Sequence, residues 1–304
     1  MAKFALEEVW TRGHLHMRVL ARPLSIQLLL SLNFHRRISS MVEATESRQR
    51  LQRHLDAVTI EAAPRVELTC GTAESAAPSL AVLDSSFNPP TRAHLHLLSL
   101  AADRLGLSRS LLLLAKQNAD KPVLGASLIQ RLEMMELVAA NASPADSVLC
   151  GVTAHPLFVD KATALRSLCP SGSTRVAILV GFDTWVRIID PKYYPADGLE
   201  PALKQIFDAV EVVVASRDPS GASNLGEMSI EEQEARVNEL PESVTRNRLH
   251  FVLNSAEMAP MSSSAIRKAV GGAENGDALP PSVLEMLPEC LHAYVESQEG
   301  LYRE

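Results

Sequence analysis

Short apolar runs alternate with amphipathic helical patterns along most of this chain, and that alternation limits the possible folds more than any other feature. The run at 79–84 is apolar and bounded by turn residues, which is typical of a buried strand. Residues 93–106 then carry leucines at helical spacing and end at Gly106, which suits a helix C-terminus. Further strands are predicted at 110–115, 147–152, 174–181, 209–216 and 249–254.

Helical patterns fill the segments between these strands. Residues 127–141 are amphipathic, with Ser127 as an N-cap. Other helices are predicted near 160–168, at 199–207, at the end of the polar stretch 217–242, and from 263 to 270. Alternating strands and helices predict βαβ units, and therefore an α/β fold with a Rossmann-like, doubly wound parallel sheet. Ligands of such sheets bind at the carboxyl ends of the strands.

Composition narrows the classes of function. The 304 residues carry a net charge of -7 and are 46% hydrophobic, which is typical of a globular protein. Acidic and basic residues are mixed along the chain without a basic stripe, so we expect no binding to nucleic acid. No apolar run reaches the length of about 18 residues that a membrane span needs, so we expect no membrane insertion.

The cysteines do not form a recognisable metal or disulfide pattern. They lie far apart in the sequence, without a CxxC pair, at Cys70, Cys150, Cys169 and Cys290. We therefore expect reduced, mostly buried thiols rather than a disulfide framework or a zinc site.

Residues 1–60 differ in composition from residues 61–304, which we expect to form one domain. The first 60 residues include a stretch with five arginines, several serines and no acidic residue, and this stretch resembles an organelle transit peptide. If it is one, the protein enters mitochondria. The alternatives are an unstructured or loosely helical extension, or a true start at Met41, and the protein is then expected in the cytoplasm or the nucleus.

The stretch LDSSFNPPTRAHLHL, residues 83–97, joins the first of these strands to the helix that follows it. Unsatisfied backbone N–H groups at a helix N-terminus attract anions. Pro89 and Pro90 stiffen the turn, Ser85 and Ser86 add hydroxyl groups, and His94 lies one turn into the helix. The chain has no Walker loop and no dinucleotide-binding GxGxxG pattern, so this loop is a different kind of anion site.

A second candidate anion site lies about 170 residues further on, in MSSSAIRKAV at 261–270. The serines at 262, 263 and 264 can cap a helix and offer hydroxyl and N–H groups to phosphate oxygens. Arg267 lies one turn in, where its guanidinium can bind charge as a fork. Taken alone, the motif is also compatible with an ordinary serine-capped helix.

Between the two motifs, VGFDTW at 180–185 ends another predicted strand. Gly181 allows a ligand to approach the backbone, and Asp183 can accept hydrogen bonds from ribose hydroxyls. Asp183 is alternatively the N-cap of the next helix.

SSFNPPTRAH and MSSSAIR together resemble the two signatures of the nucleotidyltransferase superfamily, with Phe87, Asn88 and Thr91 also in place. The closest-looking members are the eukaryotic nicotinamide mononucleotide adenylyltransferases. The resemblance implies the nucleotidyltransferase type of Rossmann-like fold. It also implies adenylyl transfer from ATP to nicotinamide mononucleotide, or also nicotinate mononucleotide, with NAD and pyrophosphate as products. Mg²⁺ is expected on the ATP, with few or no protein ligands.

The resemblance assigns a role to each matching residue. His94, with Thr91 beside it, contacts the α-phosphate, and Arg267 with Ser263 and Ser264 binds the β- and γ-phosphates. The remaining nucleotide-binding positions implied are Ser85, Ser86, Phe87, Asn88, Lys121, Gly181, Asp183, Asn254 and Ser262. Acceptor contacts are assigned to Arg131, Trp185 and Tyr193, with Tyr194 and Phe158 as further aromatic candidates for stacking. Lys121 is alternatively a solvated loop charge, and Arg131 a partner in a salt bridge within its helix.

Two departures from the family pattern leave other functions open. Ser85 replaces the glycine that opens the first motif, and TAHPLF at 153–158 lacks the tryptophan that relatives have there. Both features are compatible with a non-catalytic nucleotide-binding regulatory protein. Related enzymes that use phosphopantetheine or a phosphorylated alcohol as acceptor share both motifs. The oligomeric state does not follow from the sequence.

Overall fold

The computed structural model describes residues 42–72, 79–117, 125–169, 174–194, 198–219, 228–272, 278–298 and 300–302. The chain divides into two compact units, Met1–Arg50 and Leu51–Glu304. In the first unit, residues 42–50 are helical. The arginine-rich stretch, Met41 and Lys121 lie outside the described residues, and the domain boundary at residue 60 stays a prediction.

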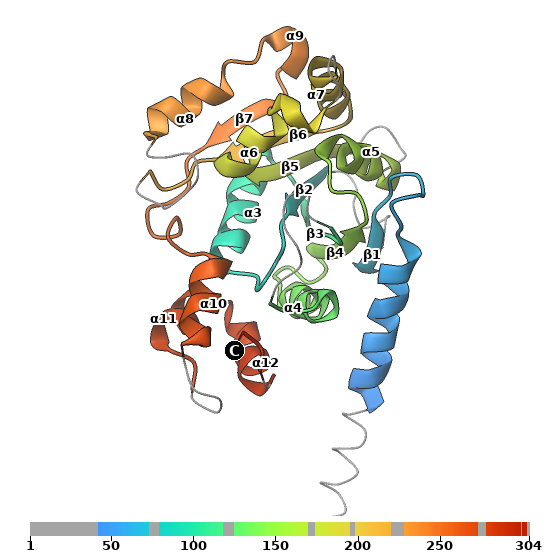
Figure 1. Ribbon diagram of the computed structural model, residues 1–304, viewed down its shortest axis with the longest axis vertical. Coiled ribbons are helices and arrows are strands. Elements are labelled where there is room, and N and C mark those ends of the chain that lie inside the picture. Colours follow the sequence, from blue (N-terminus) through green and yellow to red (C-terminus); the bar gives the residue numbers. More distant parts are fainter. Residues whose placement is uncertain are drawn as a thin grey trace, which may run out of the picture. The chain divides into compact units, whose positions relative to one another are not determined.

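In the second unit, the described strands form one seven-stranded sheet with the order β1-β4-β3-β2-β5-β6-β7 (Figure 1). The strands are β1 (Glu67–Cys70), β2 (Ser79–Asp84), β3 (Arg109–Ala115), β4 (Val148–Thr153), β5 (Arg175–Gly181), β6 (Glu211–Ala215) and β7 (Leu249–Val252). All neighbouring pairs are parallel except β1 and β4, which are antiparallel. The predicted parallel α/β sheet is confirmed, and β1 is an edge strand that the apolar patterns did not indicate.

Side chains of the central strands alternate between two hydrophobic cores, one on each face of the sheet. In β2, Ala81 and Leu83 belong to one core and Leu80 and Val82 to the other, because successive strand residues point to opposite faces. Helices cover both faces (Figure 1), so the doubly wound arrangement is confirmed.

One core includes residues of α3 (Arg92–Leu105), α4 (Leu128–Ala140), α10 (Ser263–Gly271), α11 (Pro281–Met286) and α12 (His292–Ser297). The other includes residues of α5 (Phe158–Leu168), α6 (Phe182–Ile188), α7 (Leu199–Ala209), α8 (Ile230–Val237) and α9 (Glu242–Thr245). Two 3₁₀ turns, Pro191–Tyr193 and Glu289–Leu291, and a helical segment at 51–57 are also described in this unit.

Side-chain caps define where the main helices begin. Thr91, Ser127 and Ser262 each accept a hydrogen bond from a backbone N–H of the first turn that follows them. Gly106 ends α3 in the left-handed conformation, with φ of 63°, which glycine adopts without steric cost. The N-cap predicted at Ser127 and the helix end predicted at Gly106 are both confirmed.

The four cysteines are free, but two of them are closer than their separation in sequence suggests. Cys70 in β1 lies opposite Cys150 in β4. A hydrogen bond with Cys70, together with burial, raises the pKa of the Cys150 thiol well above its usual range. Cys150 is therefore a protonated core residue at neutral pH.

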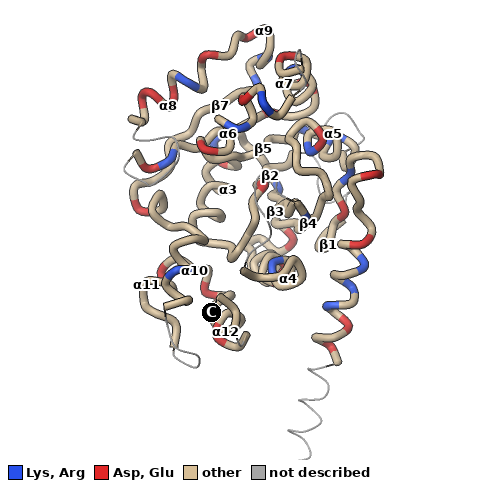
Figure 2. Tube along the Cα trace, in the orientation of Figure 1, with Lys and Arg blue, Asp and Glu red and all other residues tan. Residues whose placement is uncertain are grey.

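Charged residues of both signs are interspersed along the described trace (Figure 2). Within the described ranges, no helix is both long enough and apolar enough to cross a membrane.

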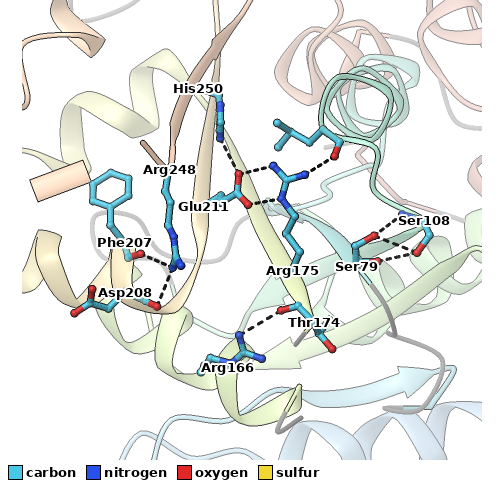
Figure 3. Close-up of polar contacts among 11 residues, drawn as sticks. Ser79, Ser108, Arg166, Thr174, Arg175, Phe207, Asp208, Glu211, Arg248 and His250 are labelled. Atoms are coloured by element: carbon cyan, nitrogen blue, oxygen red, sulfur yellow. Dashed lines mark hydrogen bonds and ion pairs between the residues drawn. The ribbon is translucent and has the colours of Figure 1, made fainter. Parts of the chain in front are cut away.

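Polar contacts join the strands at their amino ends (Figure 3). Glu211, the first residue of β6, accepts hydrogen bonds from Arg175 of β5, 2.9 Å from Nη2, and from Nε2 of His250 in β7 at 2.8 Å. Ser108 donates through its backbone N–H to the hydroxyl of Ser79 at 2.9 Å, just before β3. These contacts pair the carboxylate of Glu211 with Arg175 and His250 within the fold.

Candidate functional site

The first motif forms the loop between β2 and α3, at the carboxyl end of the central strand. β2 lies between β3 and β5, and the chain reverses its winding direction at this point, where open α/β sheets bind ligands. Phe87, Asn88, Pro89 and Pro90 are buried, so the loop has a defined conformation. Phe87 has a φ of 43°, and its ring packs 5.3 Å from the ring of His94.

Two contacts determine which nitrogen of His94 carries the proton. The backbone N–H of Thr91 donates to Nδ1 at 2.9 Å, and this nitrogen must therefore be an acceptor. In the neutral ring, the proton is then on Nε2, which lies 3.0 Å from the Ser85 hydroxyl oxygen. Burial lowers the pKa of His94 to about 4. At neutral pH, His94 is thus an uncharged imidazole whose N–H points toward the start of the loop.

The second motif contacts the first one directly. Ser263, at the start of α10, donates its hydroxyl to the carbonyl oxygen of Pro89 at 2.7 Å. Arg267 Nη1 donates to the carbonyl oxygen of Asn88 at 2.7 Å, and Nη2 donates to the Ser264 hydroxyl at 3.1 Å. The structure therefore brings together two segments that lie 174 to 179 residues apart in the sequence.

Arg131 and Gly125 also lie close to the loop of the first motif. The side chain of Arg131 is 2% exposed and donates from Nε to the carbonyl oxygen of Ala126 at 2.8 Å. Its Nη1 lies 3.4 Å from the carbonyl oxygen of Ser86. A Cβ at Gly125, where φ is 76°, would lie 3.0 Å from the Asn88 side chain and 3.3 Å from Cδ of Arg267. Only glycine allows this close approach.

Arg131 and Arg267 place two positive charges beside the loop of residues 85–91. Burial lowers the pKa of the Arg131 guanidinium, and the neighbouring positive charge of Arg267 lowers it further, while Tyr302 has the opposite effect. Arg131 and Arg267 thus lie close enough to repel each other, and an anion bound beside them would relieve the repulsion.

Gly181 and Asp183 of the segment 180–185 lie at the carboxyl end of β5. Gly181 is exposed, and a Cβ there would meet no atom within 4 Å, so the space beside this backbone is open. Asp183 is in the first turn of α6, and its carboxylate lies 3.4 Å from Nε of Arg217, which follows β6. Sequence reasoning did not identify Arg217, because a single arginine after a strand has no distinguishing pattern.

Asn254 follows β7 along the same edge of the sheet. Its backbone N–H donates to the Ser216 hydroxyl at 2.9 Å. Its side-chain oxygen is buried and has no hydrogen-bond partner among the described residues. Buried polar atoms without partners are uncommon in folded proteins, and this one is available to a ligand donor.

A cavity of about 310 Å³ begins at the first motif and extends toward α5 and α6. Its lining includes Tyr193, to which the resemblance assigns an acceptor contact, and the aromatic candidates Tyr194 and Phe158. Trp185 is fully buried in the core and does not line this cavity. The complete lining is Asp84, Ser85, Ser86, Ala115, Gln117, Pro156, Leu157, Phe158, Lys161, Thr184, Arg187, Ile188, Tyr193 and Tyr194.

Sequence reasoning missed three charged residues of this cavity, Asp84, Lys161 and Arg187. Lys161 Nζ lies 2.7 Å from Oδ2 of Asp84, and the two side chains are 5% and 11% exposed. The signal was present, because Lys161 occupies a position on the otherwise apolar face of α5 and Asp84 ends a buried strand.

Comparisons with known proteins agree with this arrangement. Residues 82–269 match the model of the family described as Cytidylyltransferase-like. A Schizosaccharomyces pombe protein, provisionally named nicotinamide mononucleotide adenylyltransferase, is 38% identical over 143 residues, which are 47% of this chain and 55% of the relative. The chain thus matches about half the length of this curated relative. The resemblance drawn from the two motifs is confirmed.

Among solved structures, the chain is similar to Plasmodium falciparum nicotinic acid mononucleotide adenylyltransferase complexed with NaAD. The TM-score is 0.51 at 14% identity, over 74% of this chain and 97% of the other. At this identity the likeness supports the fold alone, and it agrees with the sheet described above. Since the family model covers more than half of its length, the chain belongs to the cytidylyltransferase-like family.

Proposed function

We propose that this protein transfers the adenylyl group of ATP to nicotinamide mononucleotide, and also accepts nicotinate mononucleotide, forming the dinucleotide and pyrophosphate. The proposal rests on the direct contacts between the two motifs. His94 and Arg267 both contact the loop of residues 85–91, one from inside α3 and the other from α10. One loop thus places an imidazole donor and a guanidinium beside the same anion-binding backbone.

The reaction needs positioning more than it needs a base. A phosphate oxygen of the acceptor attacks the α-phosphorus of ATP, the bond to the bridging oxygen breaks, and pyrophosphate leaves. The nucleophile is already an anion, so the residues have to hold two repelling anions in line and stabilise the added charge.

In this proposal, the neutral His94 donates its Nε2 proton as a hydrogen bond to the α-phosphate. Its low pKa keeps it uncharged before substrate binds, so it acts by donation rather than by proton transfer. Arg267, Ser263 and Ser264 bind the β- and γ-phosphates, with Arg131 adding positive charge behind the loop.

Mg²⁺ would bind to the phosphates of ATP and neutralise part of their charge. Among the described residues, no group of three His, Cys, Asp or Glu side chains could hold a metal ion. In this proposal the ion is held by the phosphates of ATP, since Mg²⁺ commonly binds through substrate phosphates, and we assign it no protein ligand.

The adenosine and acceptor halves of the site have separate residues. Asp183 and Asn254, at the ends of β5 and β7, are assigned to ATP, with Gly181 leaving room for it. The cavity that begins at Ser85 and Ser86 is assigned to the acceptor, with Tyr193, Tyr194 and Phe158 as its aromatic walls. Its volume of about 310 Å³ is in the range of small-molecule sites.

One observation favours a second function, nucleotide binding without turnover. The Ser85 hydroxyl lies 3.0 Å from Nε2 of His94 and occupies the direction in which a phosphate would be bound. If Ser85 does not move aside, His94 cannot reach the α-phosphate.

Pyrophosphate release from ATP separates these functions. We expect release that depends on nicotinamide mononucleotide, and none with phosphopantetheine or phosphocholine as the acceptor. Ser85→Gly is the matched variant, and it should keep or raise the rate. Binding of ATP without release in the wild-type chain, with release restored in Ser85→Gly, would support the non-catalytic function. Pyrophosphate release that occurs only with phosphopantetheine, or only with phosphocholine, would mean that this compound is the acceptor in place of nicotinamide mononucleotide.

A further inference from the structure

Asp84 and Lys161 form an ion pair in the wall of the acceptor cavity. Lys161 Nζ contacts Oδ2 of Asp84 at 2.7 Å, and the same ammonium lies 4.7 Å from the centre of the Phe158 ring. The pair joins the end of β2 to the buried face of α5. Both side chains also belong to the cavity lining.

A role in joining β2 to α5 does not explain every polar atom of this ion pair. The second carboxylate oxygen of Asp84, Oδ1, is buried and has no hydrogen-bond partner within the described part of the chain. Buried ion pairs rarely add stability over apolar residues of similar size, and an unsatisfied charged oxygen adds a further cost. A pair that served only to join β2 to α5 would be expected to have all its polar atoms bonded.

We infer that the Asp84–Lys161 pair binds the ribose hydroxyls of the acceptor, and that it makes the protein select ribonucleotide acceptors. This inference rests on the proposed adenylyl transfer. One hydroxyl donates to Oδ1 of Asp84, and its neighbour accepts from the ammonium of Lys161. A vicinal diol matches this adjacent acceptor and donor, since each hydroxyl group can donate and accept.

Charge and position favour the ribose over other parts of the acceptor. Asp84 and Lys161 together carry no net charge, so the pair does not attract a phosphate as a lone cation would, whereas its adjacent acceptor and donor atoms suit neutral hydroxyl groups. Asp84 directly precedes Ser85 and Ser86, which are assigned to phosphate, and the ribose is the next group of a mononucleotide after its phosphate. The pyridine ring lies farther along the acceptor, beyond the ribose.

The test uses the full chain, saturating ATP and acceptors that differ only in the sugar. In wild-type protein, 2′-deoxy or 3′-deoxy nicotinamide mononucleotide should lower kcat/KM about 10- to 100-fold, as expected for the loss of a hydrogen bond to a charged group. The double variant Asp84→Ala, Lys161→Met removes both groups without leaving a buried charge. It should raise the KM for the normal acceptor, leave the KM for ATP unchanged, and lose no further activity with the deoxy acceptors.

Asp84→Asn is the second variant, since it preserves shape if the double variant does not fold. The matched control is Glu200→Gln, Lys204→Met, which removes an exposed pair of the same chemistry on α7 and should change neither KM. Equal use of normal and deoxy acceptors by the wild-type chain would overturn the inference without any variant. A deoxy penalty that persists in both variants, or a variant effect only on the ratio of nicotinamide to nicotinate mononucleotide, would also overturn it. Failure of wild-type protein with every acceptor would instead refute the proposed function, and the inference with it.

Discussion

The two ends of the parallel sheet differ in how completely their polar side chains are hydrogen-bonded. At the amino ends of β5, β6 and β7, Glu211 is bonded to Arg175 and His250, and the guanidinium of Arg248 donates to the carbonyl oxygen of Phe207 at 2.8 Å (Figure 3). At or just beyond the carboxyl ends, buried polar atoms of Asp84, His155, Trp185 and Asn254 have no partner among the described residues.

This difference indicates which end of the sheet contributes mainly to stability and which end mainly to function. Pairing at the amino ends satisfies each charge within the fold, so changes there should affect folding. Unpaired atoms and two adjacent guanidinium groups at the carboxyl ends cost stability in the free protein, and in the proposed function a bound nucleotide would satisfy the oxygens of Asp84 and Asn254 and both guanidinium groups. Changes there should affect catalysis more than folding.

The largest expected effect is at the carboxyl end. His94→Ala should lower kcat by about 100-fold or more, because one donor to the developing charge is lost. Initial rates of pyrophosphate release measure this, and thermal unfolding of the same variant checks that the chain still folds. A rate near that of the wild type would remove His94 from the reaction.

Arg267→Lys should have the next largest effect. Lysine keeps the positive charge but lacks the fork that contacts both Asn88 and Ser264, so we expect kcat/KM for ATP to fall about 10-fold. Steady-state kinetics with ATP varied at saturating acceptor gives this value. An unchanged kcat/KM for ATP would contradict the role assigned to α10.

At the amino end, Glu211→Gln should cost about 2 kcal/mol of unfolding free energy and leave kcat unchanged. Burial alone would raise the pKa of Glu211, but hydrogen bonds from His250 and Arg175 outweigh it and lower the pKa to about 2. The carboxylate therefore stabilises the fold above its ordinary pKa of 4.5, and this contribution disappears as the pH falls toward 2.

Denaturant unfolding of wild type and Glu211→Gln at several pH values tests this. The difference in unfolding free energy should be full at pH 7 and shrink below pH 4.5. A difference that does not change with pH would show that the loss comes from packing rather than from the charge of Glu211.

The smallest effect is expected for Glu200→Gln. Glu200 pairs with Lys204 on the exposed surface of α7, and both side chains are largely accessible to water. Exposed pairs of this kind contribute at most about 0.5 kcal/mol, so the melting temperature should barely change. A clear loss of stability would mean that exposed charge matters more here than the comparison of the two ends assumes.

The strands and main helices were predictable because their signals are local. An apolar run of six residues at 79–84, or leucines at helical spacing before Gly106, indicates an element without any knowledge of its neighbours. The edge strand β1 was not predictable, since its four residues have no apolar run and depend on pairing with β4. The start of the short helix α6 was not predicted correctly, since its N-cap is Gly181, and Asp183, the alternative N-cap, lies in its first turn.

The sequence by itself determined the parallel strands, the doubly wound class of the sheet and the two candidate anion-binding motifs, because periodicity and motif spacing are properties of the chain alone. Only the tertiary structure decided that the Asn88 carbonyl meets Arg267, that Trp185 is buried away from the cavity, and that Asp84 pairs with Lys161. These contacts join residues that are distant in the chain, or depend on how a side chain is turned within the packed core. Periodicity specifies which face of an element is apolar, whereas the pairing of individual side chains across elements is set by packing.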